Sequence, residues 1–344
     1  MNRPNSLKSR ISFSPFSAAA VLAVATVLFN SHVFGAPAKQ SLPTPSPEAQ
    51  AEHVILFVLE GVSEAAVKAG PMPLLGRFIR EGASTWSASG ITPSQRLPTM
   101  ASLITGLPVE KHGVTWDSFD FARGYPRPPT VFDYLDLSGG KDSAIFFMDE
   151  SMYQLAKPEP YTDYQICGAL RPECSTTTIL KYIRDYFRKA TSGHGYGHAI
   201  LSLPHLLVLH LPQPASAGVA GGWNSPAYKE ALRNVDQAMG SVLAVYKELG
   251  LLGKTVVIVT GLSGGSVPGK SVNGSGPSHV PWVAWGAGIK TGHAIKQPVS
   301  IIDTGATIMR TMNLETHTEW DSHPVEEIFR MPRSVPSGVA EHVR

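Results

Sequence analysis

The stretch HVILFVLEGV, residues 53–62, decides the class of fold. Six apolar residues, Val54 to Leu59, follow one another before the turn that Glu60 and Gly61 form. No polar residue alternates with them, as it would in a strand with one face in water. An unbroken apolar run that ends in a turn is typical of a parallel strand covered by helices on both faces. The stretch therefore predicts an α/β fold.

Strand-like and helix-like segments alternate along the rest of the chain. Helical spacing is shown by MPLLGRFIREGAS, by residues 98–106 and by TVFDYLDLSGG, and each of these helical patterns stops at a glycine. Residues 205–212 and 255–262 are strand-like, and the long amphipathic segment SPAYKEALRNVDQAMGSVLAVYKELGLL between them predicts a helix. The strand VPWVAWGAGI and the helix IIDTGATIMRTMNL follow. This order predicts a mostly parallel central sheet with helices on both faces.

Composition divides the chain into segments. Residues 1–38 combine a basic start, the apolar run FSAAAVLAVATVLF and the small residues GAPA, which indicates a secretory signal. Residues 39–51 are a Pro/Ser linker, residues 52–332 the α/β domain and residues 333–344 a tail. Residues 118–198 are less regular, and we expect a small cap-like insertion over the carboxyl edge of the sheet, where such folds place ligands.

The first segment also bears on location and charge. An uncleaved membrane anchor is the alternative to a cleaved signal, but an apolar run of 14 residues is short for a bilayer. We expect a periplasmic or secreted protein that is membrane-bound only through an uncleaved signal. Cleavage removes three basic residues and no acidic one, so the formal net charge falls from +2 to −1. This balance predicts no nucleic-acid partner.

The chain contains two cysteines, Cys167 and Cys174, in a loop that also holds proline and glycine. In an exported protein this spacing favours a local disulfide over a zinc knuckle, which needs more ligands. His194 and His198, in GHGYGH, are interpreted as parts of a solvated loop.

Five segments taken in order resemble one known family. They are MPLLGRFIREGA, PTMASLITGLPVEKHGV, SPAYKEALRNVDQAMGSVL, HVPWVAWGAGIKTG and DTGATIMRTMNL. Together they resemble the alkaline phosphatase superfamily, most closely its type I phosphodiesterase/nucleotide pyrophosphatase branch, from about His53 to Phe329. The resemblance implies hydrolysis of phosphate esters or diesters with two divalent metals, usually zinc, and a Thr, Ser or modified Cys nucleophile.

The positions that carry this chemistry in the family are largely replaced. The nucleophile position falls at Arg96, which stays protonated and cannot attack a substrate. The first-strand aspartate falls at Glu60, and the asparagine that contributes to oxyanion binding falls near Asp117. The other five metal-ligand positions are Ala215, Val219, Leu262, Ser263 and Ser271. Because alanine, valine and leucine offer zinc no donor atom, we expect no metal and no cofactor.

The retained carboxylate suggests what fills the altered centre. In the family the nucleophile and the first-strand carboxylate share a metal, so Glu60 and Arg96 should face each other. Arginine can donate two parallel hydrogen bonds to a carboxylate, and we expect this ion pair in place of the metal. The alternative is that both side chains point independently into solvent. His112, Asp236 and Asp303 match structural positions of the family, and His210 is interpreted as a core histidine.

These residues predict a catalytically inactive, exported homologue that acts by binding or as a scaffold. Glu60, Arg96 and Asp117 are the candidate binding residues, and the partner is an unidentified small anionic ligand or an envelope protein. Two alternatives stay open. One is an enzyme with relocated chemistry, and the other is a hydrolase of phosphate mono- or diesters, or of sulfate esters, with two zinc ions at a misaligned site.

Overall fold

The structure is a computed structural model. It describes residues 51–92, 94–155, 162–166, 175–193, 201–264 and 279–330, with the backbone alone for Phe121 and for residues 162–166. The predicted signal, most of the linker, the tail, Cys167, Cys174, His194, His198 and Ser271 lie outside these ranges. Within them, no helix has both the length and the apolar character that a membrane span requires.

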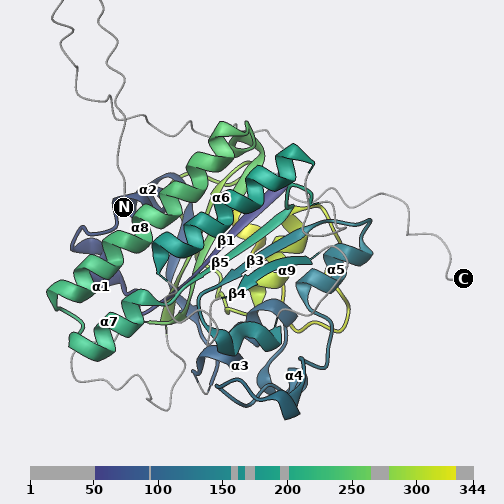
Figure 1. The fold of residues 1–344 in the computed structure, drawn as a ribbon, viewed down its shortest axis with the longest axis horizontal. Helices are drawn as coiled ribbons and strands as arrows, with labels where there is room; N and C mark the ends of the chain where they lie inside the picture. The colour runs from purple at the N-terminus through teal and green to yellow at the C-terminus, as the bar shows by residue number, and fades with distance from the viewer. Residues whose placement is uncertain are drawn as a thin grey trace, which may run out of the picture. The chain divides into compact units, whose positions relative to one another are not determined.

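An eight-stranded sheet forms the centre of the described domain (Figure 1). The strands are β1 (His53–Glu60), β2 (Ala83–Ser89), β3 (Ser143–Phe147), β4 (Thr162–Ile166), β5 (Leu206–Leu211), β6 (Thr255–Ser263), β7 (His279–Gly286) and β8 (His293–Ala294). Their order is β4-β3-β5-β1-β6-β7-β2-β8. Only β7 pairs antiparallel with its neighbours, β6 and β2. The predicted mostly parallel α/β fold is confirmed.

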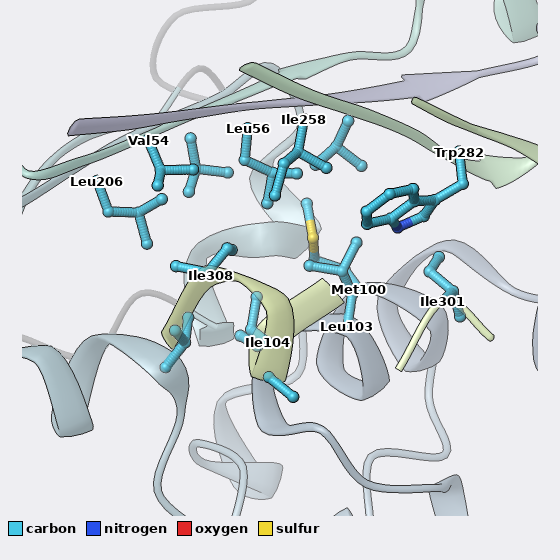
Figure 2. Close-up of a cluster of buried hydrophobic side chains, with 14 of the residues drawn as sticks. Val54, Leu56, Met100, Leu103, Ile104, Leu206, Ile258, Trp282, Ile301 and Ile308 are labelled. Atoms are coloured by element: carbon cyan, nitrogen blue, oxygen red, sulfur yellow. The ribbon is translucent and has the colours of Figure 1, made fainter. Parts of the chain in front are cut away.

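Strand β1 is buried along its whole length, as its apolar run predicts. Val54, Leu56 and Val58 belong to the core on one face of the sheet, whereas the residues between them belong to the core on the other face. Figure 2 shows the first core, where Leu56 and Ile258 of the sheet lie opposite side chains of the helical layer. Each such buried side chain contributes about 1.5–3 kcal/mol to folding.

Helices cover both faces of the sheet. On the face of Val54 lie α3 (Arg96–Thr105), α5 (Val131–Leu137) and α9 (Asp303–Thr311). On the opposite face lie α2 (Pro73–Glu81), α6 (Thr176–Ser192) and α8 (Pro226–Glu248). The remaining helices are α1 (Glu64–Lys68), α4 (Val109–His112) and α7 (Gln213–Gly221), and the 3-10 turns are η1 (Phe121–Arg123), η2 (Glu150–Leu155), η3 (Leu252–Lys254) and η4 (Glu326–Ile328).

Residues 118–198 contribute more to the domain than the sequence suggested. Strands β3 and β4 extend the central sheet beside β5, and α6 contributes to the same core as α8. The expectation of a cap-like insertion is therefore wrong for these elements. The sequence did not reveal β3 because it is an apolar run of only five residues between polar turns. Turn η2 does lie at the carboxyl end of β3 and contributes to the site described below.

Asp236 and Asp303 have the structural roles expected of them. Both carboxylate oxygens of Asp236, on α8, accept backbone N–H bonds at 2.9 Å from Leu74 and Leu75 in the first turn of α2. Helix α2 has no side-chain cap from its own N-cap residue. Asp236 caps it instead, and the two bonds link α8 to α2. Asp303 accepts the backbone N–H groups of Ser300 and His323.

Candidate functional site

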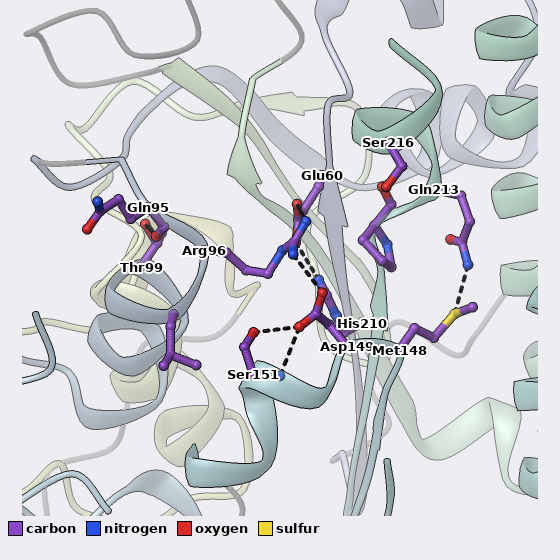
Figure 3. A network of polar contacts seen from close by, with 12 residues as sticks. Glu60, Gln95, Arg96, Thr99, Met148, Asp149, Ser151, His210, Gln213 and Ser216 are labelled. Atoms are coloured by element: carbon purple, nitrogen blue, oxygen red, sulfur yellow. Dashed lines mark hydrogen bonds and ion pairs between the residues drawn. The ribbon is translucent and has the colours of Figure 1, made fainter. Parts of the chain in front are cut away.

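A group of charged side chains lies at the carboxyl edge of the sheet. Glu60 is the last residue of β1, His210 stands one residue before the end of β5, and Asp149 follows β3. Arg96 is the first residue of α3. Because the carboxyl ends of parallel neighbouring strands meet at one edge, residues far apart in sequence come together there, as Figure 3 shows.

Arg96 and Glu60 form a two-pronged ion pair. Arg96 Nε donates to Glu60 Oε1 at 2.6 Å, and Nη2 donates to Oε2 at 3.0 Å. The Glu60 side chain is 6% exposed and that of Arg96 30%. The predicted contact is therefore confirmed, and the alternative of two independent solvent-facing side chains is wrong.

Asp149 binds the third nitrogen of the same guanidinium. Arg96 Nη1 donates to Asp149 Oδ2 at 2.6 Å. The other oxygen, Oδ1, accepts from the backbone N–H and the hydroxyl of Ser151, at 2.9 and 2.6 Å. Asp149 is thus held in place by η2 as well as by arginine. The sequence reasoning missed it, although an acidic residue just after an apolar strand is a usable signal.

His210 is buried, as expected of a core histidine, but it is also part of the site. Its Nε2 lies 2.6 Å from Glu60 Oε1, and its ring is fully buried. Nδ1 has no hydrogen-bond partner among the described residues. Burial by itself would raise the pKa of Glu60, but the hydrogen bonds and charge of His210 and Arg96 outweigh burial and lower that pKa. Glu60 is therefore held as a carboxylate.

Asp117 occupies the amino end of α3. Its Oδ1 accepts the backbone N–H of Leu97 at 2.8 Å. The residue before Arg96 makes no side-chain cap bond. Asp117, which is distant in sequence, therefore caps the first turn of α3 in its place. Burial raises the pKa of Asp117, and the nearby carboxylates of Glu60 and Asp149 act in the same direction. A carboxylate of the chain itself thus lies where a helix amino end attracts anions.

The other ligand positions offer no donor set that fits a zinc pair. Ala215 and Val219 lie on α7, and Val219 is 72% exposed. Leu262 is buried in the core, and Ser263 ends β6, where its carbonyl accepts the Gly61 N–H at 3.1 Å. Within the residues that the structure describes, no three His, Cys, Asp or Glu side chains are grouped as metal ligands would be. The residues present therefore do not fit the metals that the family resemblance implies.

The fold and the altered centre define a phosphodiesterase-like α/β protein. A model of the family type I phosphodiesterase / nucleotide pyrophosphatase matches residues 54–264. The chain belongs to this family, a branch of the alkaline phosphatase superfamily.

The chain is also similar to individual curated proteins and solved structures. Ectonucleotide pyrophosphatase/phosphodiesterase family member 1 of Mus musculus is 23% identical over 236 residues, which cover 62% of this chain and 24% of that protein. Steryl-sulfatase of Mus musculus is 29% identical and covers 72% of this chain and 36% of its own length. The chain thus spans about a quarter to a third of these relatives. Human ectonucleotide pyrophosphatase / phosphodiesterase 5 shares the fold, with a TM-score of 0.62, 13% identity, and coverage of 81% of this chain and 100% of that one.

Proposed function

We propose that this protein is a catalytically inactive member of its family that acts by binding a partner or as a scaffold. One observation carries the proposal. The residue at the nucleophile position is Arg96, and all three of its guanidinium nitrogens donate to Glu60 or Asp149. A guanidinium is not a nucleophile, and these bonds hold it where the family chemistry would need a hydroxyl and a metal.

The same bonds bear on the kind of partner. Glu60 and Asp149 take three of the five guanidinium N–H groups of Arg96, so a small anion would have to use the two that remain beside both carboxylates. Asp117 adds a third carboxylate nearby, so three carboxylates, those of Glu60, Asp149 and Asp117, lie around Arg96 and His210. This charge balance disfavours a phosphate-like ligand. An envelope protein is therefore the partner that we favour over a small anion.

The direct test combines metal analysis with activity assays. We expect the purified full chain to hold no stoichiometric zinc. It should not hydrolyse bis-p-nitrophenyl phosphate, p-nitrophenyl phosphate or p-nitrophenyl sulfate, with or without added zinc. An Arg96→Thr variant, which restores a hydroxyl alone, should be equally inactive because Ala215 and Leu262 still offer no ligand. Two zinc ions with metal-dependent turnover would establish the misaligned hydrolase instead, and turnover without metal would establish relocated chemistry.

Export to the periplasm or the medium is a second part of the proposal. It rests on the signal-like sequence of residues 1–38. Expression of the full gene in a bacterium, followed by fractionation and intact-mass measurement, should find a shortened chain outside the cytoplasm. Thiol labelling of that chain should find Cys167 and Cys174 joined rather than free. A full-length chain that stays in the cytoplasm with two free thiols would refute export.

A further inference from the structure

A large cavity lies beside the charged centre and shares none of its four side chains. Its volume is about 1380 Å³, and its walls come from the segment after β1, from α1, from β2, from the first turns of α8 and from the start of β7. Pockets for small molecules measure about 300–1,000 Å³. The size therefore favours an extended ligand with several units.

One wall contains Trp86, which a β-bulge places there. Strand β2 pairs with β7 through Thr85 opposite Trp282 and then Ala88 opposite Val280. Two residues of β2, Trp86 and its neighbour, thus face the single residue Pro281, which has no N–H to donate to the ladder. Bulges of this kind re-aim side chains next to functional sites. Trp86 lines the cavity and is only half-buried.

A second tryptophan, Trp223, lines the cavity from the turn between α7 and α8. Its ring meets the ring of Tyr228 edge to face, with centroids 5.6 Å apart. A Cβ at Gly218 would lie 2.4 Å from the Trp223 ring, and one at Gly61 would lie 2.9 Å from it, so the two glycines make room for the indole. Trp223 is therefore fixed in one orientation, which lowers the entropy that a ligand must remove.

Glu64, Arg233 and Asp236 of the cavity lining have partners, and Lys229 also lines the cavity and is exposed. Arg233 Nη2 lies 2.7 Å from a carboxylate oxygen of Glu230, and Lys68 Nζ lies 2.7 Å from Glu64. Asp236 uses both oxygens on the backbone of α2. The lining contains two basic residues, Lys229 and Arg233, and two acidic ones, Glu64 and Asp236, so a phosphate ligand meets no excess of positive charge there. The lining favours an uncharged ligand.

We propose that this cavity binds an uncharged oligosaccharide. The faces of Trp86 and Trp223 are flat apolar surfaces against which the C–H groups of sugar rings can stack. The exposed amides of Asn224 and Gln237 both donate and accept, as hydroxyl groups do. This site goes beyond the function proposed above, because it uses none of the residues that decide whether the former centre is active.

A proline-rich peptide is the rival ligand for an aromatic groove. Such grooves commonly use tyrosine hydroxyls and indole N–H groups to bind peptide carbonyls. Here the Tyr228 hydroxyl already donates to the Gly61 carbonyl at 2.6 Å, within the wall itself. The indole N–H groups of Trp86 and Trp223 remain as donors, and the exposed amides of Asn224 and Gln237 add groups that both donate and accept, as sugar hydroxyls require. We therefore favour the oligosaccharide.

Titration of the full chain with four hexasaccharides tests the proposal. Cellohexaose, chitohexaose, maltohexaose and laminarihexaose are each followed by calorimetry and tryptophan fluorescence, with a proline-rich peptide as the rival. We expect at least one sugar to bind with a Kd between micromolar and millimolar. Trp86→Ala and Trp223→Ala should each weaken that binding about tenfold or more.

Two further variants separate loss of the site from loss of the fold. Gln237→Ala, on the exposed side of α8, should weaken sugar binding several-fold while the unfolding midpoint stays unchanged. Trp116→Phe, whose indole contacts Gln154 outside the cavity, should leave binding unchanged. Failure of all four sugars, binding that persists in both Trp→Ala variants, or binding of the peptide alone would each overturn the proposal. None of these results depends on the zinc content or hydrolytic activity of the chain.

Discussion

Replacement of Arg96 by methionine tests whether the ion pair holds the former centre together. Methionine keeps an unbranched but shorter side chain and removes the charge and all three donating nitrogens. Glu60, whose side chain is 6% exposed, then keeps only the contact with His210. Asp149 loses its arginine but keeps both bonds from Ser151. The loss in the free energy of unfolding therefore comes mainly from the unpaired charge of Glu60.

The structure sets the size of that cost. Removal of one partner from a buried ion pair destabilises a protein by about 3–5 kcal/mol. We expect the low end, about 3 kcal/mol, because the Arg96 side chain is 30% exposed and His210 still contacts the carboxylate. The contact of Arg96 with Asp149, whose side chain is 27% exposed, adds at most about 1 kcal/mol.

The pH dependence distinguishes loss of charge pairing from loss of packing. In the native protein the pKa of Glu60 is lowered, so its contribution is complete above the unfolded pKa of about 4.3 and is lost as pH falls through the folded pKa. In Arg96→Met the pKa of Glu60 should rise above its native value, because burial is then opposed by His210 alone. Protonation then relieves the buried charge, so the cost should be largest near neutral pH and should shrink toward about pH 5.

Urea unfolding of the native chain and the variant at both pH values measures this difference. A double variant, Arg96→Met with Glu60→Gln, removes the stranded charge and should recover more than half of the loss near neutral pH. A cost below about 0.5 kcal/mol near neutral pH, or one that does not change on acidification, would refute the reasoning.

Three further predictions concern other parts of the domain. Burial lowers the pKa of His112 to about 4, so the native protein should lose up to about 3 kcal/mol as pH falls from about 6.5 to 4, and His112→Gln should flatten that part of a stability–pH curve measured in urea. Gly61→Ala should cost more than about 2 kcal/mol in urea unfolding, because Gly61 has φ +73° and a Cβ there would lie 2.6 Å from Ala215 Cα. Millimolar phosphate should leave the thermal unfolding midpoint of the native chain unchanged, and an increase would show that an anion reaches Arg96 despite Glu60.

The elements that could be predicted are those whose own residues show the hydrophobic periodicity of a strand or a helix. Strand β1 and the long helix α8 were readable because a buried strand and an amphipathic helix each carry their own periodicity. Strands β3 and β4 were not, because each has only five residues and gains its place by pairing with strands distant in sequence. The antiparallel direction of β7 is likewise a property of the sheet and not of the segment.

The same distinction holds for the charged centre. The contact between Glu60 and Arg96 followed from the family resemblance, which links two positions 36 residues apart. Asp149 and His210 have no such link, because nothing in the family chemistry assigns them a role. His210 stands in an apolar run, where a core role explains it equally well until the register places it beside β1. Polar residues near the carboxyl ends of buried strands are therefore the signal to examine.

Under the function proposed above, a catalytic centre of the family type would require several substitutions made together. Glu60 is buried, and its charge is compensated by Arg96 and His210 rather than by a metal. A hydroxyl at position 96 removes the guanidinium, and Ala215 and Leu262 have no donor atom for a metal, so we expect that single change to leave the Glu60 carboxylate without a cation and to give no activity. If metal ligands are introduced while Arg96 is kept, the guanidinium places a positive charge at the position of the metal. Each change alone should lower the stability of the protein until the others are made. The reason is that the buried Glu60 carboxylate needs a cation beside it, and Arg96 supplies that cation in this chain.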